Sequence, residues 1–236
     1  GYITDMNYDD TVRMTANKAV KNGWVVVQDT AWKGYEDIPA WIMQGYAVMA
    51  DEAMIQLNQQ GINVPTHIFM QAGVGSLAGS IQGYFTSKFG DSRPITAVVE
   101  PNKADCFYQS ALAGDGRPRK VTGDLDTIMA GLACGEPNPQ GWNILWDYCD
   151  MFISCPDYIA AKGMRILGNP LGVDPRVVSG ESGAVTTGIL YEILKNENLT
   201  ELREQLKLNQ DSAILVFSTE GDTDPVNYRK IVWDVN

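Results

Sequence analysis

Residues 66–80 read Thr66-His67-Ile68-Phe69-Met70-Gln71-Ala72-Gly73-Val74-Gly75-Ser76-Leu77-Ala78-Gly79-Ser80, an apolar run followed by a glycine-rich turn. We expect a strand over residues 66–70 and a helix over residues 77–89, where apolar side chains recur at helical spacing. Glycines let a backbone approach a ligand closely, and free N–H groups at a helix start bind anions. The stretch therefore predicts a strand–turn–helix unit suited to a phosphate, with a ligand-free tight turn as the alternative.

Strands and helices alternate on either side of this unit. We expect further strands at residues 24–27, 95–100 and 213–217, and helices over residues 7–22, over residues 38–61, from Ser154 towards Gly168, and over residues 181–196. Ser154-Cys155-Pro156-Asp157 has the form of a capping box for the third of these helices. Segments 102–125 and 135–150, rich in Gly, Pro and Asp, are expected to be irregular surface loops. This alternation indicates an α/β fold with a mostly parallel sheet and helices on both faces.

Length and charge narrow the class of protein. The chain has 236 residues, enough for one sizeable core, and a net charge of −11. An acidic surface disfavours nucleic acid and anionic membranes as partners, and acidic composition is common among cytoplasmic enzymes. No apolar run approaches the roughly 18 residues of a membrane span. We therefore expect a protein that binds neither nucleic acid nor membrane.

Histidine and cysteine usage excludes several chemistries. The single histidine, His67, lies within the predicted buried strand, so a structural role is expected and a Ser-His-Asp or Cys-His hydrolase is disfavoured. With one histidine and no C-x-x-C pair, we expect no metal site. The four cysteines are expected to be free thiols, with a Cys106–Cys134 disulfide as the alternative.

Three further positions are candidates for chemistry. Asp29 ends a predicted strand near Trp32 and Tyr35, where desolvation would raise its pKa and suit a general base; a turn aspartate is the alternative. Glu181 lies at a predicted helix start, where it could contact a ligand or simply stabilise the helix. Ser218 and Thr219 follow the last predicted strand, where hydroxyl groups would point into a crevice at the sheet edge.

A nicotinamide-dependent oxidoreductase could use the same glycine-rich turn. Gly73-x-Gly75-x-x-x-Gly79 loosely matches a dinucleotide fingerprint, and Glu100 ends the next predicted strand, where a ribose-binding acid would lie. Such a fingerprint usually follows the first strand of its domain, whereas here a helix, a strand and a long helix come first. This order weakens the hypothesis without removing it.

The order of the motifs resembles fold-type II pyridoxal-phosphate (PLP) enzymes, a group that includes the tryptophan synthase β chain. Within that group, the chain resembles the C-terminal part of the diaminopropionate ammonia-lyase family. The resemblance spans almost the whole chain and rests on the stretches Thr4–Val12, Gln28–Trp32, Trp41–Tyr46, Gln71–Gly75, Ile128–Pro139, Ser179–Ala184 and Ser218–Asp224.

The resemblance implies an activity and a set of roles. It implies a cytoplasmic homodimer that eliminates ammonia from 2,3-diaminopropionate, giving pyruvate and two ammonia molecules. Asp29 resembles one of two aspartates that take the α-proton, the one serving the L-substrate. The cofactor-binding residues that it implies are Gly73, Val74, Gly75, Ser76 and Leu77 for the phosphate, Ser218 or Thr219 for the pyridine nitrogen, and Glu181 at the helix start.

The resemblance also implies a domain division. Residues 1–40 would belong to a small domain and residues 41–236 to a large PLP-binding domain. The lysine that binds the cofactor covalently in this family would precede Gly1, so we expect the 236 residues alone to be inactive. The alternatives are a serine or threonine dehydratase of the same fold, and a binding module without catalysis.

Overall fold

The computed structural model describes residues 3–233 and contains one parallel sheet. Its strands, β1 (His67–Gln71), β2 (Ile95–Pro101), β3 (Met151–Cys155) and β4 (Ile214–Val216), lie in the order β3-β2-β1-β4. The register pairs His67 with both Ile95 and Ile214, and Ala97 with Met151. The predicted α/β class and parallel sheet are therefore confirmed.

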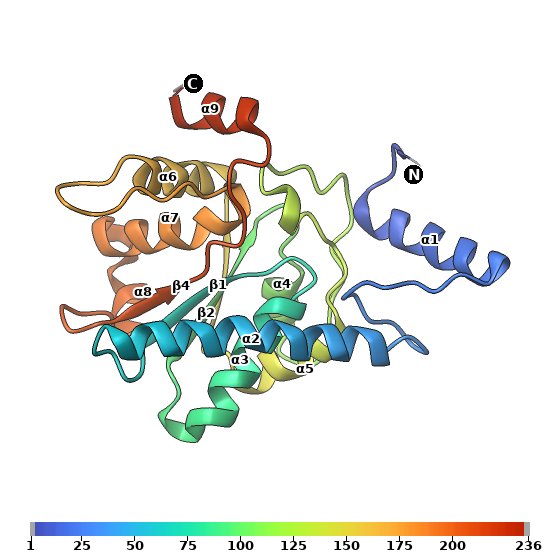
Figure 1. Ribbon diagram of the computed structural model, residues 1–236, viewed down its shortest axis with the longest axis horizontal. Helices are drawn as coiled ribbons and strands as arrows, with labels where there is room; N and C mark the ends of the chain where they lie inside the picture. The colour runs from blue at the N-terminus through green and yellow to red at the C-terminus, as the bar shows by residue number, and fades with distance from the viewer. Residues whose placement is uncertain (1–2, 234–236) are drawn as a thin grey trace.

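Helices cover both faces of the sheet (Figure 1). One face carries α2 (Asp37–Gln59), α3 (Ser76–Phe89), α4 (Cys106–Ala113) and α5 (Pro139–Tyr148). The other carries α6 (Asp157–Gly168), α7 (Glu181–Lys195) and α8 (Thr200–Gln205). Three short 3-10 helices, Gly90–Ser92, Ala130–Leu132 and Glu197–Leu199, lie in the connections.

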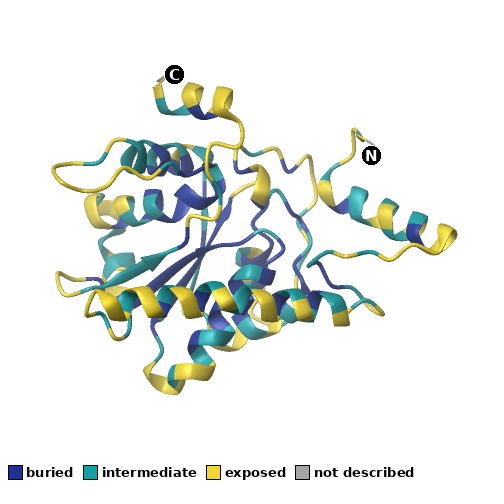
Figure 2. Ribbon diagram, in the orientation of Figure 1, coloured by how far each residue is buried: buried dark blue, intermediate teal, exposed yellow. Residues whose placement is uncertain are grey.

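The alternation of side chains along β1 explains why two layers of helices are needed. Ile68 and Met70 pack into one core with residues of α2, α3 and α5, whereas Phe69 packs into another with residues of α6 and α7. Successive strand residues point to opposite faces, so an apolar run such as Ile68–Met70 requires cover on both sides. Figure 2 shows this burial along the strands, with exposed residues on the outer surfaces of the helices.

Two helices lie at the periphery. Helix α1 (Tyr8–Asn22) begins after Asn7, whose Oδ1 accepts from the Asp10 amide at 2.9 Å, and ends at Gly23 with a φ of 68°. It lies at one edge of the molecule, apart from the helices on the sheet (Figure 1). Helix α9 (Pro225–Trp233), which the sequence did not predict, packs Tyr228 against Met164 of α6 and Ala184 of α7.

Several local predictions were wrong. Residues 24–27 form no strand, and Trp24, Val25 and Val27 are 58%, 79% and 72% exposed, because no described strand pairs with them. The segments predicted as surface loops contain α4 and α5, and Trp142 of α5 is fully buried. Ser154 caps no helix: it lies in the unpredicted strand β3, and its hydroxyl donates to Asp105 at 2.8 Å.

His67 has the structural role that was predicted. It is 3% exposed, its Nε2 donates to the Leu206 carbonyl at 2.7 Å, and Nδ1 lies 2.7 Å from Thr66 Oγ1. Cys106, Cys134, Cys149 and Cys155 are all free thiols, so the structure contains no Cys106–Cys134 disulfide.

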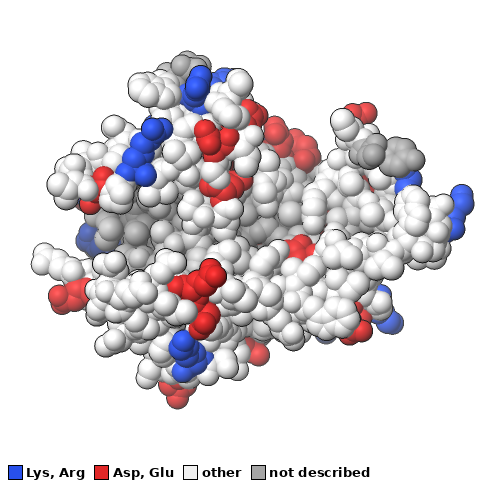
Figure 3. All heavy atoms as spheres, viewed as in Figure 1, with Lys and Arg blue, Asp and Glu red and all other residues white. Residues whose placement is uncertain are grey.

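The surface carries dispersed charges. On the face shown in Figure 3, the Lys and Arg side chains lie apart and form no single basic area. Among the described residues, no helix combines the length and the apolar character required to cross a bilayer.

Candidate functional site

A cavity of about 310 Å³ opens at the carboxyl edge of the sheet, where the segments after β1 and β4 meet. Segments far apart in the sequence line it, as expected for a parallel α/β sheet. Its lining consists of Tyr8, Asp29, Gln71, Ala72, Gly73, Val74, Gly75, Ser76, Leu77, Ala78, Ala130, Gly131, Leu132, Cys134, Ser182, Thr219 and Glu220. The structure thus brings Asp29, the glycine-rich turn and Thr219 into one cavity.

The glycine-rich turn can adopt its shape only with glycine at its last position. Gly75 has a φ of 83°, and a Cβ there would lie 2.1 Å from Phe107 Cζ. Helix α3 begins at Ser76, and its first intrahelical bond at the cavity runs from the Gly79 amide to the Gly75 carbonyl at 2.8 Å. The amides of the first turn therefore have no partner within the helix and can bind an anion.

Asp29 is attached to the same turn through its backbone. Its carbonyl accepts from Ser76 Oγ at 2.7 Å and from Asn138 Nδ2 at 2.9 Å. Asn138 is fully buried, donates also to Ser76 Oγ at 2.7 Å, and caps α5 through a bond from the Gln140 amide to its Oδ1 at 2.9 Å. One buried amide thus joins the Asp29 segment, the start of α3 and the start of α5.

The aromatic partner of Asp29 differs from the one expected. Trp32 and Tyr35 stack on each other, with ring centroids 4.2 Å apart, whereas Tyr46 of α2 donates to Asp29 Oδ2 at 3.1 Å. Burial, followed by the nearby Asp29 charge, raises the pKa of Tyr46 to about 12, so this hydroxyl remains a donor at neutral pH. Sequence reasoning missed Tyr46 and Asn138, because nothing local indicates these contacts.

The two hydroxyl candidates after β4 have different environments. Thr219 lines the cavity, and its Oγ1 accepts from Gln71 Nε2 at 3.0 Å. Ser218 is not among the lining residues, and its hydroxyl donates to Ser179 Oγ at 2.9 Å.

The start of α7 contributes Ser182 rather than the predicted Glu181. Glu181 is absent from the lining, and burial, with the Glu220 and Asp224 charges adding to it, raises its pKa. Glu220 lines the cavity, and its Oε1 accepts from the Ser182 amide at 2.8 Å.

The structure contradicts the dinucleotide hypothesis at Glu100. This residue is fully buried, and its two carboxylate oxygens accept from the Phe107 and Tyr108 amides at 2.9 and 2.7 Å. Burial raises its pKa to about 8 against the opposing effect of these bonds. Glu100 therefore holds the start of α4 and has no oxygen available for a ribose.

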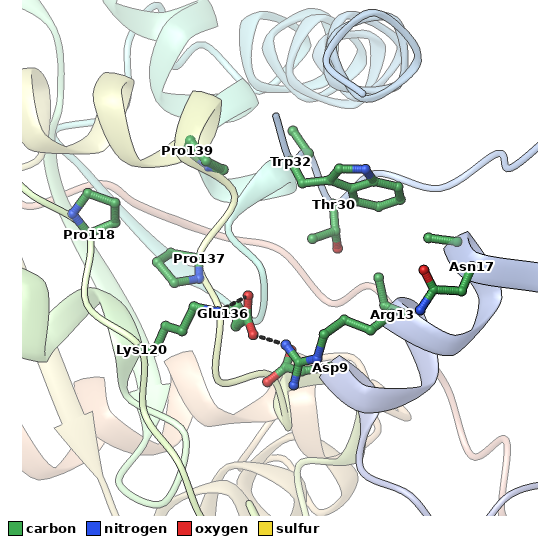
Figure 4. Close-up of a pocket in the computed structure, with 13 residues that line it drawn as sticks. Asp9, Arg13, Asn17, Thr30, Trp32, Pro118, Lys120, Glu136, Pro137 and Pro139 are labelled. Atoms are coloured by element: carbon green, nitrogen blue, oxygen red, sulfur yellow. Dashed lines mark hydrogen bonds and ion pairs between the residues drawn. The ribbon is translucent and has the colours of Figure 1, made fainter. Parts of the chain in front are cut away.

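A second cavity, of about 480 Å³, lies between α1 and the segments around Pro118 and Pro137 (Figure 4). Glu136 lies at its centre, where it pairs with Arg13 of α1 and with Lys120, whose Nζ lies 2.7 Å from Oε2. The contact between Tyr8 Oη and Thr30 Oγ1, at 3.2 Å, links a residue of the smaller cavity to one of the larger.

Comparison with known proteins gives consistent matches. The family model described as "Pyridoxal-phosphate dependent enzyme" matches residues 2–219. The chain is 55% identical over 232 residues to diaminopropionate ammonia-lyase of Escherichia coli strain K12, and 53% identical over 233 residues to that of Salmonella typhimurium strain LT2. Each match covers 98% of this chain and 58% of the relative, so the chain spans less than two thirds of their length.

Solved structures agree with this similarity. The crystal structure of the E. coli diaminopropionate ammonia-lyase in complex with an aminoacrylate-PLP azomethine reaction intermediate superposes with a TM-score of 0.90 at 54% identity. The superposition covers 98% of this chain and 58% of that structure.

Proposed function

Since the chain belongs to the pyridoxal-phosphate dependent enzyme family, we propose that its smaller cavity binds pyridoxal phosphate in a diaminopropionate ammonia-lyase. The activity would be α,β-elimination from 2,3-diaminopropionate to pyruvate and two ammonia molecules. Because the chain spans 58% of its relatives, the proposal concerns a protein of their length that carries these residues. Its main support is that Asp29, the glycine-rich turn and Thr219 line one cavity.

The cavity fits a phosphorylated ring in several respects. Its lining includes neither Lys nor Arg, so a phosphate would be held by the backbone amides at the start of α3 and by the positive end of that helix. Gln71 Oε1 and Ser182 Oγ are buried and have no hydrogen-bond partner among the described residues, yet both residues line the cavity. A ligand with polar groups would supply the hydrogen bonds that these two atoms lack.

The residues have distinct proposed roles. When bound, the cofactor supplies the electron sink that stabilises negative charge at the substrate Cα. Gly73, Val74, Gly75, Ser76 and Leu77 would hold its phosphate, and Thr219 would face its ring nitrogen. Asp29 would take the α-proton on Oδ1, because Oδ2 already accepts from Tyr46.

Substrate profiling tests the activity. A protein of the relatives' length should release two ammonia molecules per pyruvate from 2,3-diaminopropionate and act poorly on serine and threonine. Asp29→Asn should lower turnover of the L-substrate by about 100- to 10,000-fold, as expected for loss of a general base. Asp147→Asn, at an exposed carboxylate of α5, is the matched control and should leave turnover unchanged. Turnover of the L-substrate by Asp29→Asn at the wild-type rate would overturn the role of Asp29 as general base.

We also propose the finer organisation that the family resemblance implies: a cytoplasmic homodimer with residues 1–40 in the small domain and 41–236 in the large one. An exposed stripe on α2 supports self-association, since Trp41, Val48 and Ile55 are 65%, 58% and 52% exposed and recur every seven residues on one helix face. Light scattering after gel filtration should show a dimer that Val48→Glu dissociates. A monomeric wild type would contradict the homodimer.

A further inference from the structure

Gln71 connects the end of β1 to the segment after β4 in a fixed orientation. Gln71 is only 3% exposed. Its Nε2 donates both to the Phe217 carbonyl at 2.9 Å and to Thr219 Oγ1 at 3.0 Å. A carbonyl oxygen can only accept, so the amide nitrogen, and not the amide oxygen, must face Phe217. The two protons of the Gln71 side-chain amide are therefore both used in these two hydrogen bonds.

The orientation of the amide determines the role of the Thr219 hydroxyl. Since Thr219 Oγ1 accepts from Gln71, its own proton is left to donate elsewhere, and no hydrogen bond between described residues uses that proton. Thr219 lines the cavity. We propose that Gln71 is a positioning residue that directs the Thr219 hydroxyl proton to the ring nitrogen of a pyridine cofactor. This inference rests on the proposed cofactor site.

Ser218 provides an internal contrast. Its hydroxyl donates to Ser179 Oγ at 2.9 Å, and it is not among the residues that line the cavity. Its proton is therefore already engaged outside the site. Of the two hydroxyl groups that the sequence proposed for the ring nitrogen, the structure assigns this role to Thr219.

The direction of the hydrogen bonds has a chemical consequence. The chain of donors runs from the Gln71 amide to Thr219 and from Thr219 to the ring, so the ring nitrogen must accept. A nitrogen that accepts is unprotonated, and a hydrogen bond to the neutral form disfavours its protonation. Gln71 would thus help to keep the pyridine ring neutral by acting through the Thr219 hydroxyl.

A pair of ligands tests this inference without relying on activity. Pyridoxine 5′-phosphate has no aldehyde, so its binding requires no lysine, and its 1-deaza analogue replaces the ring nitrogen with C–H. Isothermal titration calorimetry on a cofactor-free protein of the relatives' length that carries these residues should show that the pyridine ligand binds about 3- to 10-fold more tightly, the size of one neutral hydrogen bond. Thr219→Val should reduce this ratio to about one, and Thr219→Ser should retain it.

Two variants of Gln71 make the test specific. Gln71→Glu replaces the donor with acceptors, which would draw the Thr219 proton away from the cavity, and should reduce the ratio to about one. Gln71→Met removes the donor without adding charge and should lower the ratio in the same direction. Inorganic phosphate should bind all folded variants equally, because the glycine-rich turn is unchanged. Ser218→Ala should keep the wild-type ratio.

The outcomes separate the two proposals. Failure of the wild type to bind phosphate or either ring ligand would overturn the cofactor site and this inference together. Binding of both ligands with equal affinity would overturn the role of Thr219 and Gln71 while leaving the cofactor site standing. A wild-type ratio in both Gln71 variants, or its loss in Ser218→Ala, would show that Gln71 does not direct the hydroxyl.

Discussion

The two cavities on either side of the Tyr8–Thr30 contact are lined in opposite ways. The larger one, of about 480 Å³, combines apolar side chains such as Trp32 with Glu136, which pairs with both Arg13 and Lys120. The smaller one, of about 310 Å³, combines a backbone turn with two buried polar atoms that lack partners among the described residues.

From this difference we infer that the smaller cavity, and not the larger one, is the ligand site. Leaving a buried polar atom without a hydrogen bond costs about 1–3 kcal/mol. Two such atoms in one cavity therefore indicate that a bound ligand provides their hydrogen-bond partners. In the larger cavity, Glu136 already pairs with Arg13 and Lys120, and Asp9 Oδ2 accepts from the Gly135 amide at 2.9 Å, so these charged side chains have partners within the protein. We therefore expect substitutions around the smaller cavity to alter binding and those around the larger one to alter stability alone.

The largest effect is expected at Gly75. In Gly75→Ala, the new Cβ would lie 2.1 Å from Phe107 Cζ, and alanine would have to adopt a φ of 83°. Overpacking and backbone strain together should destabilise the fold by about 3 kcal/mol or more. The displaced turn should no longer bind inorganic phosphate. Urea unfolding and calorimetry measure the two effects.

Gly45→Ala is the matched control, because an added Cβ at this exposed position of α2 meets nothing within 4 Å. Alanine in place of a helical glycine should stabilise the fold by about 0.5–1 kcal/mol. Phosphate affinity should be unchanged. Normal phosphate binding by Gly75→Ala would mean that the turn does not form the anion site.

Asn138→Ala should have the next largest effect. The substitution removes the cap of α5 and the donors to the Asp29 carbonyl and Ser76 Oγ, all within a fully buried setting. We expect a loss of about 2–3 kcal/mol in the free energy of unfolding. Phosphate binding should weaken as well, since the start of α3 loses its attachment.

Asn143→Ala, at an exposed position of the same helix, controls for the change of residue type. Its effect on stability should stay within about 0.5 kcal/mol. If Asn138→Ala lowered stability but left phosphate affinity at the wild-type value, Asn138 would be a helix cap only.

The sequence predicted those parts of the fold and site that depend on local pattern. The strand at residues 66–70 and the glycine-rich turn were recognised because an apolar run, a turn and a helix start follow one another within 15 residues. The end of the helix predicted over residues 7–22 has the same local origin, because the next residue, Gly23, readily adopts the positive φ found there. These features arise from neighbours in the chain.

Features that depend on distant contacts were missed. Residues 24–27 have a typical strand composition, but a strand needs a pairing partner, and the described residues supply none. The Gly and Pro content of segment 135–150 predicts a surface loop, yet Trp142 anchors α5 in the core. The roles of Tyr46, Asn138 and Gln71 rest on side-chain contacts over 17 to 148 residues of sequence, which no local motif encodes.

The smallest effect is expected in the larger cavity, from Glu136→Gln. Burial raises the pKa of Glu136, but the hydrogen bonds from Lys120 and Arg13 together outweigh it and hold this pKa below its ordinary value of 4.5. The folded state therefore binds fewer protons than the unfolded state, and the contribution to stability is present above pH 4.5 and lost as the pH falls through the folded pKa. Because both cations are largely exposed, we expect a loss of no more than about 1 kcal/mol at pH 7.

That loss should disappear at low pH and shrink in high salt, as expected for partly exposed ion pairs. Urea unfolding of wild type and Glu136→Gln at pH 7 and at pH 3 measures it, with Glu201→Gln, an exposed carboxylate of α8, as the control. Phosphate affinity should be unchanged, because Glu136 lines only the larger cavity. If Glu136→Gln weakened phosphate binding as much as Asn138→Ala did, the two cavities would act as one site, and the contrast between them would fail.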